Sequence, residues 1–193
     1  MSTAGPNNPG TVTTAATFLS VTGLVDWTNP TNVEGSSAFA TAVITNEASG
    51  GYESYWLKAT NFSLGVPSGA TINGITATLA RKEDAGSDLK FLSVILIKSN
   101  AALTGSASKV GSVWSTSTTD EVFGSSSDLW SASPVPTDSD VNDSTFGVAA
   151  LVFNVSAVNA SRTASVQNFR ITVTYTAAGG GVGQCSTSGL FGF

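Results

Sequence analysis

Residues 61–82, which read NFSLGVPSGATINGITATLARK, decide the fold class. Apolar and small or polar residues alternate over 62–66, which is the period-two pattern of a half-buried strand. The Pro-Ser-Gly sequence at 67–69 predicts a tight turn, because proline presets φ and glycine accepts a positive φ. Alternation resumes over 75–80. The stretch therefore predicts two strands joined by a turn, as in an antiparallel β domain.

The remaining strand signals extend this pattern along the chain. Residues 89–98 (LKFLSVILIK) and 146–155 (FGVAALVFNV) are apolar on both faces, as expected for strands that are covered on both sides. Residues 165–176 alternate most regularly, and we expect them to form a hairpin with 146–155. Shorter strands are predicted within 11–25, at 38–45 and at 55–60. With no convincing amphipathic helix, the sequence predicts an all-β protein, an antiparallel β-sandwich of jelly-roll type.

The chain has 193 residues, which is enough for one domain that folds without disulfides. We predict a β-sandwich over residues 11–176, with a flexible arm at 1–10 and a glycine-rich tail at 177–193. The arm is either a disordered end or a segment that orders on a neighbouring subunit. The tail ends in an apolar tip, which is either frayed or docked against its own or a neighbouring subunit. The candidate partner-contact residues are Pro6, Pro9, Leu190, Phe191 and Phe193.

Composition argues against several functional classes. Lys and Arg number eight and the net charge is −5, whereas a nucleic-acid-binding domain needs a basic patch. The N-terminal residues lack the pattern of a secretory signal, and the longest apolar run is far shorter than the roughly 20 residues of a membrane span. We therefore expect a soluble protein that contacts neither nucleic acid nor membrane. Only 11% of residues are charged, which is compatible with self-assembly.

The residue types needed for common catalytic arrangements are missing. The chain has no His, so a Ser-His-Asp triad, an imidazole base and a His metal ligand are all excluded. No phosphate-binding loop is present, and no helix is expected after the glycines of the tail. Carboxylates that could serve glycoside hydrolysis are present, as in most proteins. The sequence predicts no enzyme, no cofactor and no metal.

Two candidate binding features have an alternative structural interpretation. The stretch DSDVND at 138–143 offers oxygen ligands suited to calcium, but it lacks the glycine and glutamate of a helical calcium loop. These residues are more typical of turn caps before the strand at 146. Trp56, Trp114 and Trp130 could form a platform that stacks on sugars, although aromatic residues in a sandwich of this size more often pack in the core or at its rim.

The order of several motifs resembles a family of small phage and prophage virion proteins. These motifs are WTNPTN at 27–32, FSLGVPSGATINGI at 62–75 followed by Arg81, Trp114, GSSSDLW at 124–130, Asp140, FGV at 146–148 and ITVTY at 171–175. Each is a pattern of turn and core residues, and their shared order over most of residues 6–176 carries the resemblance. The chain departs from the family pattern at Val66, at Ser125–Ser127 and at Ser131.

The resemblance implies a β-sandwich that is part of a virion assembled in the host cytoplasm. The first role we expect is a capsid decoration, or cement, protein that forms a homotrimer and contacts the major capsid protein. The arms at 1–10 and 177–193 would then reach neighbouring subunits. The alternative is a tail or head fibre domain that recognises host glycans through exposed Trp residues and Asn/Asp loops.

Overall fold

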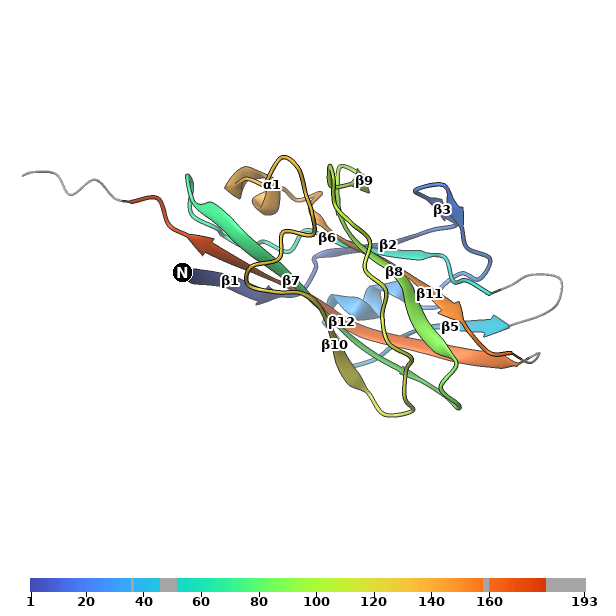
Figure 1. Ribbon diagram of the computed structural model, residues 1–193. Coiled ribbons are helices and arrows are strands. Elements are labelled where there is room, and N and C mark those ends of the chain that lie inside the picture. Colours follow the sequence, from blue (N-terminus) through green and yellow to red (C-terminus); the bar gives the residue numbers. More distant parts are fainter. Residues whose placement is uncertain (36, 46–51, 158–159, 180–193) are drawn as a thin grey trace, which may run out of the picture.

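Two antiparallel sheets form the body of the computed structural model, which describes residues 1–35, 37–45, 52–157 and 160–179 (Figure 1). Sheet A comprises β1 (Ser2–Asn7), β5 (Ala40–Thr45), β7 (Thr71–Glu83), β10 (Thr119–Gly124) and β12 (Ser161–Thr176). Sheet B comprises β2 (Thr11–Ala15), β6 (Trp56–Thr60), β8 (Leu89–Lys98), β9 (Ala101–Ala102) and β11 (Gly147–Asn154). The remaining elements are the hairpin of β3 (Thr17–Phe18) and β4 (Val21–Thr22), the 3-10 helix η1 (Pro30–Glu34) and the helix α1 (Asp138–Asn142). None of the helices in the described part of the chain is long and apolar enough to cross a membrane.

The strand order confirms the predicted β-sandwich and its jelly-roll type. Strands β5 to β12 are arranged as β5-β12-β7-β10 in one sheet and β6-β11-β8-β9 in the other. The chain passes to the opposite sheet at every connection among these strands except the β8–β9 hairpin. This alternation produces the two nested Greek keys of a jelly roll. Strand β1 adds to sheet A, and β2 adds to the edge of sheet B.

Strand β12 is central to sheet A. One side of β12 pairs with β7, and the other side pairs with β5 near its start and with β1 near its end. A β-bulge at Asn168, which has a φ of 50°, shifts the phase of the strand. As a result Val166 and Phe169 both face the interior, although they are three residues apart.

The core lies between the inner faces of the two sheets. Alternate residues of each long strand supply it, which follows from the period of two along a β-strand. The fully buried side chains include Ile75, Ala77 and Leu79 of β7, Phe91, Val94 and Leu96 of β8, Val148, Ala150 and Val152 of β11, and Phe169, Ile171 and Val173 of β12. The prediction for residues 89–98 is confirmed, because β8 occupies this range and buries apolar side chains on both faces.

The prediction of a strand at 62–66 is wrong, although its burial pattern is right. Phe62, Leu64 and Val66 are buried, but the backbone between them turns through positive φ at Ser63 and Gly65. No ladder forms, and the Asn142 side chain instead bonds to both the N–H and the carbonyl of Val66, at 2.9 and 2.7 Å. The predicted turn at 67–69 is present and leads into β7.

The predicted hairpin between 146–155 and 165–176 is also wrong. Strand β11 pairs with β6 and β8 in sheet B, whereas β12 lies in sheet A. Because β11 is apolar on both faces, it fits the middle of sheet B, and the chain crosses the sandwich before β12 begins.

The N-terminal segment is a strand of the sandwich and not a separate arm. Ser2 pairs with Tyr175 and Ala4 with Val173, so β1 extends sheet A along the end of β12. The register shift between Ala4 and Asn7 contains Pro6, which has no N–H for the ladder. Asn7 then donates from its side-chain amide to the carbonyls of residues 62 and 63. These contacts are all with the same chain, which the composition of 1–10 did not reveal.

Candidate functional site

The outer face of sheet B has a covered half and an open half. The β3–β4 hairpin covers one half, where Phe18 packs edge-on against Trp56 with ring centroids 5.4 Å apart. Ile95, Ile97, Ala149 and Leu151 complete this apolar cluster, which is separate from the core between the sheets. In the open half, the outward positions of β2 and β6 are occupied by threonine and lysine instead of aromatic residues.

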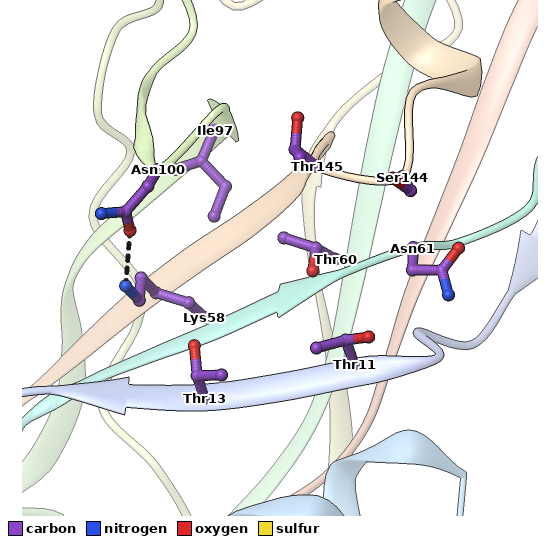
Figure 2. Close-up of a pocket in the computed structure, with 9 residues that line it drawn as sticks. All are labelled: Thr11, Thr13, Lys58, Thr60, Asn61, Ile97, Asn100, Ser144 and Thr145. Atoms are coloured by element: carbon purple, nitrogen blue, oxygen red, sulfur yellow. Dashed lines mark hydrogen bonds between the residues drawn. The ribbon is translucent and has the colours of Figure 1, made fainter.

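The open half contains a pocket of about 440 Å³. This volume falls within the range of about 300–1,000 Å³ that is typical of small-molecule sites. Figure 2 shows its lining, to which strands from three parts of the sequence and three loops contribute. The lining residues are Thr11 and Thr13 of β2, Lys58 and Thr60 of β6, Ile97 of β8, and Asn61, Asn100, Ser144 and Thr145 of the adjoining loops.

The strand register explains why these side chains meet. Thr11 is paired with Thr60 and Thr13 with Lys58, so four polar side chains of neighbouring strands lie on the same face. Gly147 of β11 is paired with Thr60 on one side and Ile97 on the other. Since glycine has no side chain, nothing projects from β11 at this position, and a space remains between the side chains of β6 and β8.

Among the residues that the structure describes, Lys58 is the only charged one that lines the pocket. Its ammonium donates to the Asn100 side-chain oxygen at 2.6 Å and lies 5.3 Å from the centre of the Phe18 ring. It forms no ion pair with any residue that the structure describes. Partial burial removes water from the ammonium and lowers the pKa of Lys58 from its ordinary value.

The loops at the rim have defined conformations. Ser99 and Asn100 both have positive φ, as required in the tight turn between β8 and β9, and this turn brings the Asn100 amide over Lys58 (Figure 2). The Thr145 hydroxyl bonds to Asp143 at 2.7 Å and accepts from the Ser99 N–H at 3.0 Å. The two loops are therefore tied together at the mouth of the pocket.

The chemistry of the lining suits recognition of a polar ligand. Five hydroxyl groups and two side-chain amides can each donate and accept hydrogen bonds, and one ammonium can meet a negative charge. The lining residues include no carboxylate that would neutralise this ammonium. The threonine methyl groups offer apolar contact beside these polar groups, whereas Ile97 at the base of the pocket is only 1% exposed.

Sequence reasoning missed this pocket, because its residues come from segments that only the sheet brings together. A local signal was present at Lys58. It lies among the mostly buried residues of β6, where a lysine is unusual.

The three tryptophans considered for sugar stacking are buried, Trp114 and Trp130 in the core and Trp56 in the apolar cluster beneath the β3–β4 hairpin. Trp56, Trp114 and Trp130 are at most 1% exposed, which confirms the packing interpretation and excludes an exposed platform. The Trp130 indole donates to the carbonyl of Ile75 at 2.8 Å, and Trp114 packs against Phe91. The prediction that a fibre domain would recognise glycans through exposed Trp residues is therefore wrong for these three tryptophans.

The aspartate-rich stretch at 138–143 forms and caps α1. Thr137 and Asp140 form a reciprocal capping box, and Asp140 is also 2.6 Å from the Lys98 ammonium. These contacts stabilise the carboxylate and lower the pKa of Asp140 to about 2. Within the described residues, no group of three or more His, Cys, Asp or Glu is placed to hold a metal ion.

The predicted partner-contact residues are scattered. Pro6 is exposed on β1, whereas Pro9 is buried in its own domain. Leu190, Phe191 and Phe193 lie outside the described residues.

Comparisons with known proteins identify no family for this chain. No protein-family model matches the chain, and no curated protein matches it. The fold is similar to that of a solved structure described as "CBM4 structure and function", with a TM-score of 0.33 and 9% sequence identity over 69% of this chain and 82% of that chain. A similarity at this level carries no argument about function.

Proposed function

We propose that this chain is a virion structural protein of the capsid decoration type. It would stabilise a shell by associating with copies of itself, as a homotrimer, and with the major capsid protein. The proposal rests on the ordered motifs that resemble small phage and prophage virion proteins, and not on the comparisons above.

One structural observation supports a role in assembly. The pairing of Ser2 with Tyr175 brings the N-terminus beside the end of β12, so both ends of the described chain lie at the same end of the sandwich (Figure 1). The segment 180–193, with its apolar residues, follows in sequence from that end. The described chain therefore ends close to the N-terminal strand, and Pro6 on that strand is exposed and accessible to a neighbouring subunit.

The solution mass of the purified chain tests this proposal. We would compare the full chain, a chain ending at residue 179, and a full-length variant in which Leu190, Phe191 and Phe193 are replaced by serine. The proposal predicts a trimer that dissociates in both altered chains, and the serine variant separates the effect of apolar contact from that of chain length. Occupancy on purified particles that does not change when the tail is altered would rule out this role for the tail.

A second candidate function, recognition of host glycans by a fibre domain, is favoured by the pocket on sheet B. The pocket combines hydroxyl, amide and ammonium groups on a β-sheet face and would take over the role first given to the tryptophans. Glycan-array binding by the full chain tests it. Binding that survives the loss of the pocket's polar groups would refute this assignment.

A further inference from the structure

Lys58 differs from most basic residues of the chain in forming no ion pair with a carboxylate in the described part of the chain. Five others form ion pairs, namely Arg81, Lys98, Lys109, Arg162 and Arg170. Lys58 is half-buried in the pocket, and its described partners are a neutral amide and an aromatic ring. An ammonium that has lost part of its hydration without gaining a counter-charge is a favourable place for an anion to bind.

The number of charges in the pocket limits the kind of anion. One ammonium matches one negative charge, and the lining offers neither an arginine fork nor a second cation for a phosphate dianion. A carboxylate therefore fits this site better than a phosphate ester.

The other lining groups indicate what carries the carboxylate. The hydroxyls of Thr11, Thr13 and Thr60 lie on one side of Lys58, and Asn100 and Thr145 lie at the rim (Figure 2). These groups can both donate and accept hydrogen bonds, and so can the hydroxyls of a sugar ring, so the two sets are complementary. The methyl groups of these threonines offer apolar contact for the C–H groups of such a ring.

We propose that the pocket binds an acidic saccharide, a sugar ring bearing one carboxylate, with the carboxylate on Lys58 and the ring hydroxyls on the threonines and Asn100. This inference rests on the glycan-recognition candidate and names its ligand class. It does not depend on whether the chain decorates a capsid.

The test is a titration of the isotope-labelled full chain followed by amide NMR shifts. Glucuronate and glucose form a matched pair of probes, because they differ only in the carboxylate at C6. Acetate serves as a third probe that carries the charge without the ring. We expect shifts at Thr13, Lys58, Thr60 and Asn100, with glucuronate bound at least about tenfold more tightly than glucose.

Two variants locate the binding charge. Lys58→Gln removes the ammonium. Asn100→Asp replaces the amide that accepts a hydrogen bond from the Lys58 ammonium with a carboxylate, which would neutralise it. Aspartate tolerates the left-handed conformation at this turn position, so the second variant should keep the fold. Each variant should lose at least about tenfold in glucuronate affinity. Lys90→Gln, on β8 and outside the pocket, is the matched control and should bind as the unaltered chain does.

Each other outcome overturns a specific part of the inference. Equal binding of glucose and glucuronate would keep glycan recognition and refute the acidic class. Acetate binding as tightly as glucuronate would refute the saccharide. Absence of shifts with all three probes would refute both the inference and the pocket's role in the glycan candidate. Unchanged affinity in Lys58→Gln, with a native thermal transition, would refute the role of the ammonium.

Discussion

Replacing Arg81 with methionine should strongly destabilise the sandwich. Arg81 points inward from β7, and its guanidinium bonds to Glu121 at 3.0 Å and to the Thr119 hydroxyl at 2.7 Å. Arg81 and Glu121 are 7% and 9% exposed. Glu121 also accepts from the Ser112 N–H. The ion pair thus links β7 and β10 with the segment that runs beside β8.

The expected magnitude follows from this burial. Removing one member of a buried ion pair leaves the other charge uncompensated, at a cost of about 3–5 kcal/mol. In a chain of this length each kcal/mol lowers Tm by about 2–4 °C, so Arg81→Met should lower it by about 6–20 °C. Replacing Glu121 with leucine in the same chain removes the orphaned carboxylate and should recover most of this loss.

Thermal and urea unfolding of the two single variants and the double variant would measure the coupling. Arg170→Met is the matched control, because the Arg170–Asp120 pair is 31% and 50% exposed and such pairs contribute about 1 kcal/mol or less. Equal destabilisation by Arg81→Met and Arg170→Met would contradict the reasoning. So would a double variant that is no more stable than Arg81→Met.

Three further predictions follow from other contacts. Lys58→Met should leave the free energy of unfolding unchanged or raise it, because it removes a partly desolvated charge; a loss above about 1 kcal/mol in thermal unfolding would show that Lys58 is structural. The pKa of Asp140 is about 2, below its ordinary value of 3.8. Its contribution to the free energy of unfolding should therefore be complete above about pH 3.8 and lost as the pH falls toward 2. The full shift corresponds to about 2.5 kcal/mol, which screening of the 29% exposed side chain should reduce to about 1 kcal/mol. Urea unfolding of the chain and of Asp140→Asn across this range would measure it, and parallel pH profiles would contradict it. Leu96→Asp and Ile171→Asp should each unfold the domain, since both positions are fully buried; a soluble variant with a cooperative melt would disprove the assigned strand faces.

The elements with the strongest local patterns could be predicted from the sequence. Strand β8 matches its predicted range, and α1 lies where the aspartates suggested a cap. Residues 62–66 show the limit of such patterns. The alternating burial there arises from the positive φ of Ser63 and Gly65 and from hydrogen bonds to Asn142, which is 76 residues away from Val66. The local hydrophobic pattern reveals neither of these causes.

The pairing of strands and the pocket required long-range information. Nothing in the composition of residues 1–10 indicates that Ser2 pairs with Tyr175, because the partner strand determines this pairing. The pocket is a similar case. Thr13 and Lys58 become neighbours only when β2 aligns with β6, and Asn100 joins them through the turn after β8. A search for local motifs therefore finds the strands but not the site that they form.

The central position of β12 has a consequence for how the chain folds during synthesis. Strand β12 is the pairing partner of β1, β5 and β7, so β1 and β5 have no neighbour in sheet A, and β7 has only β10, until residues 161–176 have left the ribosome. Sheet A therefore cannot be completed before these residues have been synthesised, and most contacts of the described chain join distant parts of the sequence, which is typical of slow folding. Until then the edges of β5 and β7 that later pair with β12 are open, and open strand edges are sites at which incompletely folded chains aggregate.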